Sequence, residues 1–219
     1  MALFGVFSGG VIVGGSRDPC LALRSLRAEG LAMEWLLSHR ADPPAVRLAD
    51  RHYSRGTPGT AQFMRPCRDV VLVSRDRLSV WATAWQKYID HPWRDAWECV
   101  IFRREGGTVV ASELIRQALA VTRWKWPDPP RNGMVTMVDS GKTRHKRDPG
   151  RCFIRAGFVP IYCCLPRGSK VVLQASREFL LTIEPEAPRE TTMDLIVYDN
   201  VTRTLSLEGP QDNGEVKRG

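Results

Sequence analysis

The dipeptide His52-Tyr53 lies in a polar segment of the chain, flanked by Arg51 and Arg55. A neutral imidazole can accept a proton near pH 7, and a phenol can donate or accept a hydrogen bond, so the pair is suited to general acid–base chemistry. A histidine in a polar loop also often serves as a turn or capping residue. Both interpretations of His52 and Tyr53, catalytic and structural, stay open at this point.

Asp139 is the second group that could take part in proton transfer. It ends an apolar run, GMVTMVD over Gly133 to Asp139, which is typical of a buried strand. Sheets of α/β proteins place ligand-handling residues at the carboxyl ends of their strands, where this carboxylate could orient an attacking amine or hold His52. The following Ser140 and Gly141 favour the alternative, a turn or capping aspartate.

A phosphate-binding turn is the third candidate. Gly106 and Gly107 follow Arg103 and Arg104, and the turn leads to Ser112, which we predict to cap a helix. Free N–H groups at a helix N-terminus, together with a cationic side chain, form a site for phosphate. Because strand residues alternate between faces, only one of the two arginines can face a given ligand, and we expect it to be Arg103.

The densest basic segment of the chain comes directly after Asp139. Such a loop is usually solvated surface, but beside a reactive strand it can grip a phosphate backbone. The residues predicted to bind nucleic acid are Lys142, Arg144, Lys146, Arg147 and Arg151.

Composition is consistent with a globular basic protein. The chain has 219 residues, 43% of them apolar, and a formal charge of +8, which favours anionic partners such as nucleic acid or coenzyme A. The six cysteines form no C-x-x-C pair and the four histidines have no zinc-ligand spacing, so we expect no metal site. Without a secretory signal or a membrane span, we expect a cytoplasmic protein with reduced thiols. The apolar, glycine-rich segment that begins at Met1 has two interpretations. It is a loose strand at the edge of the sheet, or it precedes the true translation start at Met33.

The elements that must position these residues alternate between strands and helices. An amphipathic helix, or two, is expected over Pro19 to His39, followed by a loop from Leu48 to Pro66. Helices are expected at Ser112 to Arg123 and Arg151 to Ala156. Strands are predicted at Asp69–Ser74 and Ser79–Trp85, which form a hairpin, and at Trp97–Arg103, Gly133–Asp139, Phe158–Cys164, Val171–Ala175 and Asp194–Tyr198. This order predicts an α/β or α+β fold.

Three parts are expected along the chain. Residues 1–40 form an N-terminal segment with the amphipathic helix, and residues 41–184 form the main domain. Residues 185–219 form a C-terminal extension, disordered in part, because this segment is polar and irregular.

The main domain resembles GNAT-like acyltransferases encoded by phages and mobile elements. The similar segments are Trp97 to Ala118, Gly133 to Ser140 and Pro149 to Phe158, where Arg155-Ala156-Gly157-Phe158 matches a short helix that ends in Gly-Phe before a strand. The resemblance implies a mixed, mostly antiparallel sheet flanked by helices. It also implies acetyl-CoA or a related acyl-CoA as the donor.

Within this superfamily the chain is distantly similar to Mom-type phage proteins, which modify adenine in DNA. The positions that match are His52-Tyr53, Arg103, Ser112 and Asp139. The similarity implies that Arg103, Gly106, Gly107 and Ser112 bind the cofactor and that His52, Tyr53 and Asp139 are catalytic. It further implies DNA as a partner.

Two departures from the family pattern bear on the chemistry. The usual Q/R-x-x-G-x-G/A phosphate loop is replaced by Arg103 to Gly107, and the tyrosine that often protonates the leaving thiolate is replaced by Phe153. We therefore expect a transferase that moves an acyl or related group from a coenzyme A-type donor to an amine, such as an exocyclic amine of a DNA base. The alternative is a catalytically inert basic module of the same fold that binds nucleic acid.

Overall fold

One mixed β-sheet organises the part of the chain that the computed structural model describes, residues 32–85, 93–143, 148–161 and 170–189. Its strand order is β1-β2-β3-β4-β5-β7-β6, and every neighbouring pair is antiparallel except β4 and β5. The strands are β1 (Trp35–Ser38), β2 (Arg68–Ser74), β3 (Ser79–Trp85), β4 (Trp97–Arg104), β5 (Met134–Asp139), β6 (Val159–Ile161) and β7 (Lys170–Ala175).

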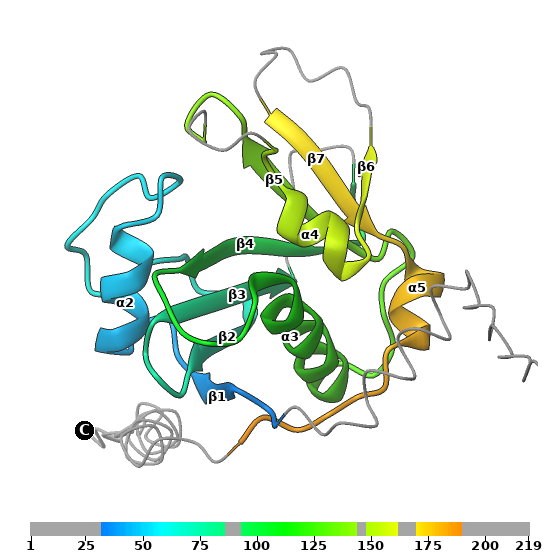
Figure 1. The fold of residues 1–219 in the computed structure, drawn as a ribbon, viewed down its shortest axis with the longest axis horizontal. Helices are drawn as coiled ribbons and strands as arrows, with labels where there is room; N and C mark the ends of the chain where they lie inside the picture. The colour runs from blue at the N-terminus through cyan, green and yellow to red at the C-terminus, as the bar shows by residue number, and fades with distance from the viewer. Residues whose placement is uncertain (1–31, 86–92, 144–147, 162–169, 190–219) are drawn as a thin grey trace, which may run out of the picture. The chain divides into compact units, whose positions relative to one another are not determined.

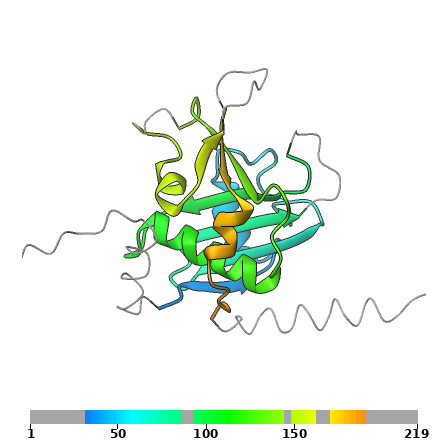
Figure 2. The same ribbon diagram turned by 90° about the vertical axis from the view of Figure 1, so that its right-hand side faces the viewer.

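Helices cover both faces of this sheet (Figures 1 and 2). They are α2 (Pro43–Asp50), α3 (Ala111–Lys125), α4 (Arg151–Ala156) and α5 (Arg177–Thr182). Helix α2 packs its buried Ala45, Leu48 and Ala49 against one face of the sheet, while α3 lies against the other. The expected class is confirmed: the protein is an α+β fold with a mixed, mostly antiparallel sheet flanked by helices.

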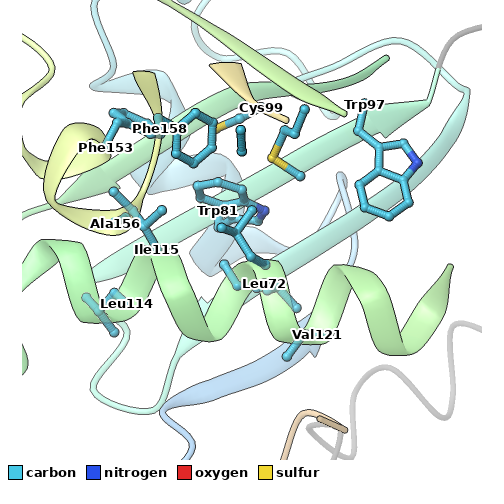
Figure 3. Close-up of a cluster of buried hydrophobic side chains, with 14 of the residues drawn as sticks. Leu72, Trp81, Trp97, Cys99, Leu114, Ile115, Val121, Phe153, Ala156 and Phe158 are labelled. Atoms are coloured by element: carbon cyan, nitrogen blue, oxygen red, sulfur yellow. The ribbon is translucent and has the colours of Figure 1, made fainter. Parts of the chain in front are cut away.

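The larger core lies between the sheet and α3. Trp81 is fully buried there and contacts Phe102 and Phe153, so α4 is joined to the same core (Figure 3). The indole of Trp35 donates to the carbonyl of Leu114 over 2.7 Å. Burial of these aromatic side chains, each worth roughly 1.5–3 kcal/mol, fixes α3 on the sheet.

The predicted hairpin is confirmed. β2 and β3 pair in register from Arg68 opposite Trp85 to Val73 opposite Val80. Arg77 adopts a left-handed backbone (φ 56°), and the Ser74 hydroxyl donates to Asp76 over 2.5 Å in the turn. Long apolar runs that are buried on both faces make these strands easy to recognise from sequence.

The helix expected over Pro19 to His39 is wrong at its C-terminal end, because Trp35–Ser38 is strand β1. Its apolar residues lie at helical spacing, but antiparallel pairing with β2 and burial of Trp35 outweigh that local pattern. Residues 1–31 lie outside the described part of the chain. The compact unit that contains the sheet begins at Met33.

Helix α2 was not expected, because Pro43 and Pro44 suggest the end of a helix. In the structure these prolines begin the helix, where the missing N–H costs no hydrogen bond. The loop expected from Leu48 to Pro66 therefore starts after Asp50. Helix α5 was also not expected, although the Ser176 hydroxyl accepts a hydrogen bond from Phe179 N–H and caps it.

The remaining boundaries are close to those predicted. α4 coincides with the expected Arg151 to Ala156 helix, and β5 and β7 differ by one residue. β6 is described only as far as Ile161, and the strand predicted at Asp194 to Tyr198 and the rest of the C-terminal extension after Arg189 lie outside the described residues.

Candidate functional site

β4 and β5 separate toward their carboxyl ends. Their parallel pairing is recorded over three positions, from Trp97 opposite Met134 to Cys99 opposite Thr136, although β4 continues to Arg104 and β5 to Asp139. The arrowheads of the two strands diverge in Figure 1. Beyond Cys99 and Thr136, the main-chain N–H and C=O groups of the two strands therefore do not pair with each other. Ligands of α/β proteins tend to bind at such openings, at the carboxyl ends of strands.

A β-bulge in β4 lies beside this opening. Ala82 pairs with Ile101 and the next residue, Thr83, pairs with Cys99, so Val100 is the additional residue. A bulge leaves one residue out of the ladder and bends the strand, and bulges are common next to active sites. Here it follows directly after the last β4–β5 pair.

The bulge also decides which face each later residue of β4 occupies. Cys99 and Phe102 contact the core under α3, whereas Val100 and Ile101 contact the core under α2. Arg103 consequently lies on the α2 side. Arg104 lies on the α3 side, which is the reverse of what simple alternation from Trp97 would give.

Tyr53 reaches the end of β5. Its hydroxyl accepts a hydrogen bond from the backbone N–H of Asp139 over 3.4 Å. Burial raises the pKa of this tyrosine above its usual value, and the Asp139 N–H opposes the rise only in part. The hydroxyl accepts this hydrogen bond, and no acceptor for its own proton is found among the described residues.

His52 stacks on Tyr53, with ring centroids 4.3 Å apart. Its Nδ1 lies 2.7 Å from the Ser54 hydroxyl and 3.3 Å from the Ser54 backbone N. When Nδ1 accepts the N–H of Ser54, the neutral ring carries its proton on Nε2. In that tautomer Nε2 carries the proton, so His52 cannot act as a base.

Asp139 begins a tight turn. Its Oδ1 accepts the N–H of Lys142 over 3.1 Å, and its carbonyl accepts both the N–H and the hydroxyl of Thr143. The Nζ of Lys142 in turn donates to the carbonyl of Tyr53 over 3.3 Å. The structure thus places the 52–53 segment beside the turn after β5, and it gives Asp139 the turn role that was its alternative.

Arg103 joins this group from the end of β4. It donates to Glu105 over 2.8 Å and to the carbonyl of Arg51 over 2.5 Å, and Arg51 donates to the other oxygen of Glu105 over 2.6 Å. Hydrogen bonding from Arg103, aided by the charge of Arg51, lowers the pKa of Glu105. Arg103 therefore anchors the segment that carries His52 and Tyr53.

Arg104, not Arg103, contacts the loop that leads into α3. It donates to the carbonyl of Gly107 over 2.6 Å and to that of Val109 over 3.1 Å. In a trans peptide the C=O of one residue and the N–H of the next point in opposite directions. The N–H groups of Thr108 and Val110 are consequently directed away from Arg104, and both residues are exposed.

Gly107 is required by the shape of this loop. Its φ is +95°, and a Cβ there would meet Asp76 Oδ2 at 2.5 Å.

Ser112 is not the N-cap as predicted: α3 begins one residue earlier, at Ala111, with Val110 in the cap position and no side-chain cap bond. Ser112 lies in the first turn instead, where its N–H is one of the groups that lack an intrahelical acceptor.

The predicted nucleic-acid loop is described only at its ends. Lys142 and Arg151 are exposed, while Arg144, Lys146 and Arg147 lie outside the described residues. Nucleic-acid binding by this loop stays a prediction.

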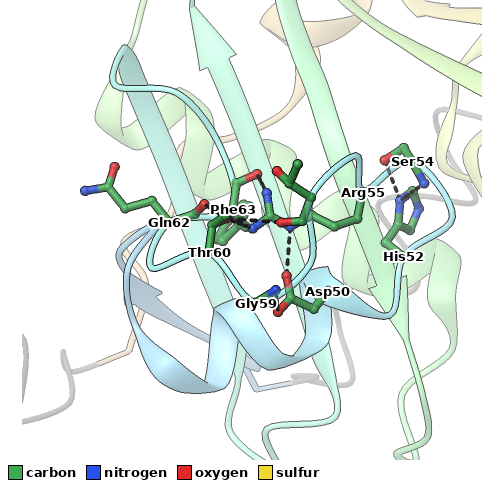
Figure 4. A network of polar contacts seen from close by, with 9 residues as sticks. Asp50, His52, Ser54, Arg55, Gly59, Thr60, Gln62 and Phe63 are labelled. Carbon is green, nitrogen blue, oxygen red and sulfur yellow. Dashed lines mark hydrogen bonds and ion pairs between the residues drawn. The ribbon is translucent and has the colours of Figure 1, made fainter.

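The structural role of Arg55 was not predicted from the sequence. The segment after α2 is organised by Arg55, whose side chain is only 7% exposed and which forms an ion pair with Asp50 over 2.8 Å (Figure 4). The sequence signal was an arginine among small and polar residues, a pattern that usually indicates solvated loop.

The same segment forms one wall of a depression of about 660 Å³ beside α2.

In the described ranges no helix is long and apolar enough to cross a membrane, and no cluster of three metal-ligating side chains is found. Compared with models of protein families, with curated proteins and with solved structures, the chain gives no significant match.

Proposed function

We propose that the protein is a GNAT-like transferase that moves an acyl or related group from a coenzyme A-type donor to an amine. The observation that carries the proposal is the opening between β4 and β5, two parallel strands whose pairing is recorded only up to Cys99 and Thr136. The bulge at Val100 borders this opening, and Tyr53 reaches the Asp139 end of β5. The resemblance of three sequence segments to GNAT-like proteins supports the same function.

The loop before α3 fits the phosphates of a coenzyme A-type donor. Arg104 donates to the carbonyls of Gly107 and Val109, so the N–H groups of Thr108 and Val110 point away from Arg104. N–H groups that are exposed at a helix N-terminus are suited to bind phosphate. Residues 106–112 of this loop and first turn would bind the phosphates, and Arg104 would fix the loop. When bound, the donor supplies an activated acyl group as a thioester.

Tyr53 is the residue best suited to hold a proton in this site. Phe153 is buried against Phe102 and Phe158 and has no ionisable group. Tyr53 is the one tyrosine in the described part of the chain, and its phenol, like any tyrosine's, carries its proton at neutral pH. It would donate that proton to a leaving group, and positioning and proton donation of this kind contribute roughly 10²–10⁴-fold to a rate.

The acceptor amine must lose a proton during transfer. His52 meets this need only in the tautomer that carries its proton on Nδ1 and donates it to the Ser54 hydroxyl. The second carboxylate oxygen of Asp139 would accept a hydrogen bond from the amine while Oδ1 holds the turn. A DNA base amine as acceptor rests on the similarity to Mom-type proteins and on the net charge of +8.

Calorimetric titration of the purified protein with acetyl-CoA and with coenzyme A tests the first part of the proposal. We expect binding of both, together with acylated nucleosides in DNA from cells that express the protein, detected by mass spectrometry. No binding of either compound at millimolar concentration would refute the transferase function.

The second candidate is an inert basic module of this fold that binds nucleic acid. It is favoured by the engagement of His52 Nδ1 and Asp139 Oδ1 with N–H groups of their own turns. Nucleic-acid binding without coenzyme A binding in the same titrations would select this candidate.

A further inference from the structure

A depression of about 660 Å³ follows the solvent-facing side of α2. Four of its lining residues recur at helical spacing along α2, on the side opposite the buried Ala45, Leu48 and Ala49. The opposite wall is the 59–61 segment. The lining residues are Ala41, Pro43, Val46, Arg47, Asp50, Arg51, Gly59, Thr60 and Ala61.

The opposite wall is held in place by a buried arginine (Figure 4). The guanidinium of Arg55 forms the ion pair with Asp50 and also donates to the Thr60 hydroxyl and to the carbonyls of Gln62 and Phe63. The second oxygen of Asp50 accepts the N–H of Gly59 over 2.9 Å. A charged side chain that satisfies several loop carbonyls rigidifies the loop, so this wall is formed before any ligand arrives.

The depression combines cationic and apolar groups. Arg47 is exposed, and no ion pair or hydrogen bond is recorded for it among the described residues. The side chain of Arg51 is half exposed and shares Glu105 with Arg103. Pro43 and Val46 add aliphatic side chains to the lining. The volume lies within the range of pockets that hold small ligands, roughly 300–1,000 Å³.

We propose that this depression binds a nucleotide unit of the acceptor, with its phosphate on Arg47 and Arg51 and its ring on the aliphatic surface. Guanidinium groups pair with phosphate in two-point geometry, and flat rings pack on aliphatic walls. The depression is continuous in sequence with the reactive segment, because Arg51 precedes His52 and Tyr53. The inference rests on the proposed transferase function and names the chemical class of its acceptor.

Fluorescence anisotropy with a labelled single-stranded dodecanucleotide tests the proposal. Arg47→Glu is expected to weaken binding at least tenfold and to lower the salt slope by about 0.7 for each phosphate of the single strand that the variant no longer neutralises. Arg47→Lys should weaken binding less than Arg47→Glu does, because it keeps the charge and loses only the two-point geometry of the guanidinium. Arg131→Glu, an exposed arginine that precedes β5, makes the same change of charge elsewhere and is expected to leave affinity within threefold.

Two competition arms separate the sources of the ligand chemistry. Displacement of the probe by a free nucleoside monophosphate, but not by equal inorganic phosphate, would support recognition of the whole nucleotide unit. Displacement by phosphate alone with equal efficiency would overturn it. Equal losses of affinity in Arg47→Glu and Arg131→Glu would also overturn the proposal, because they would indicate nonspecific attraction to a basic surface.

Acetyl-CoA titration of the same variants separates this inference from the proposed function. We expect Arg47→Glu to bind acetyl-CoA with unchanged affinity while losing the oligonucleotide. If Arg47→Glu weakens acetyl-CoA binding and leaves the oligonucleotide bound, the depression belongs to the donor and the inference fails, while the transferase function stands. Urea unfolding of each variant must give a midpoint close to that of the parent for the comparison to count.

Discussion

The hydroxyl of Tyr53 lies 3.4 Å from the backbone nitrogen of Asp139, a residue 86 positions later in the chain. This hydrogen bond joins the segment after α2 to the end of β5, across the opening that β4 and β5 leave between them. Lys142 repeats the connection from the other side by donating to the Tyr53 carbonyl. Two loops that are distant in sequence are thereby fixed against each other at the candidate site.

Replacement of Tyr53 by Phe tests its role as proton donor. Because the ring and its packing remain, we expect acetyl-CoA affinity within threefold of the parent and a fall in kcat of about 10²–10⁴-fold. Steady-state kinetics with an amine acceptor measures both quantities. An unchanged kcat would exclude Tyr53 from proton transfer.

The pKa of Tyr53 makes a separate prediction about alkaline stability. Burial raises this pKa, so the unfolded chain loses the phenolic proton at a lower pH than the folded protein does. The stabilisation is complete below the unfolded value of about 10 and is lost as pH rises through the folded pKa. Urea unfolding at pH 9 and pH 11 should therefore show a larger loss of stability for the parent than for Tyr53→Phe. Equal losses would contradict the burial of this hydroxyl.

Arg104 and Arg103 should affect donor binding unequally. Arg104→Ala removes the bonds to the Gly107 and Val109 carbonyls, so we expect acetyl-CoA binding to weaken by about 1–3 kcal/mol. Arg103→Ala is the matched variant, because it deletes the same side chain on the α2 side and should cost less. Calorimetry of the two variants decides, and a larger effect of Arg103→Ala would restore the original expectation that Arg103 contacts the phosphates.

The Asp50–Arg55 pair should stabilise the fold in a pH-dependent way. Arg55→Ala leaves Asp50 and three loop acceptors without their donor and is expected to cost about 2–4 kcal/mol. The hydrogen bond from Arg55, followed by that from Gly59 N–H, lowers the pKa of Asp50. The stabilisation by this carboxylate is therefore present above the unfolded pKa of about 3.9 and is lost as pH falls through the folded value.

Urea unfolding of the parent and Asp50→Asn at pH 7 and pH 3 measures this dependence. The difference in stability between the two proteins should be smaller at pH 3. A difference that is constant across this range would show that the carboxylate charge contributes nothing.

Gly157 at the end of α4 should tolerate no side chain. Its φ is +109°, and a Cβ there would overlap the ring of Phe179. We expect Gly157→Ala to destabilise the protein by about 2 kcal/mol or more, from both backbone strain and the clash. Gly56→Ala is the control, since nothing lies within 4 Å of a Cβ at that position. Thermal unfolding of both variants gives the comparison, and equal midpoints would contradict the packing of α5 on α4.

Cys99 should be the least reactive thiol in the described part of the chain. It is buried, and burial raises its pKa well above the usual value, so little thiolate forms at neutral pH. Peptide mapping after brief iodoacetamide treatment should find Cys152 modified before Cys99. Modification of Cys99 at the same rate would mean that solvent enters between β4 and β5 as far as the pair formed by Cys99 and Thr136.

The fold could be predicted from sequence where one pattern dominates. The β2–β3 hairpin and helix α4 were predicted correctly, because long apolar runs and a terminal glycine leave few alternatives. Strand β1 was predicted as helix since Leu36 and Leu37 suit either structure, and only pairing with β2 selects the strand. Helix α2 was missed because a proline pair signals both the end and the beginning of a helix.

The site could be predicted in part. The residue types at the site, a His-Tyr pair and an aspartate after a buried strand, could be read from the sequence, but the hydrogen bond between Tyr53 and Asp139 could not. The roles of Arg103 and Arg104 could not be predicted, because they depend on the irregular pairing at Val100. The role of Arg55 could not be predicted either, since two of its acceptors are main-chain carbonyls that carry no sequence signal.

The bulge at Val100 makes the arrangement of charge at the site depend on the number of residues in β4 as well as on their kind. If the same residues paired regularly, Arg103 and Arg104 would exchange faces, and Arg104 would no longer face the loop before α3. Deletion of Val100, by contrast, would return β4 to regular pairing with each arginine still on its present face. A single-residue deletion in this protein would thus remove the unpaired backbone while keeping both positive charges, which no substitution at positions 103 or 104 can do.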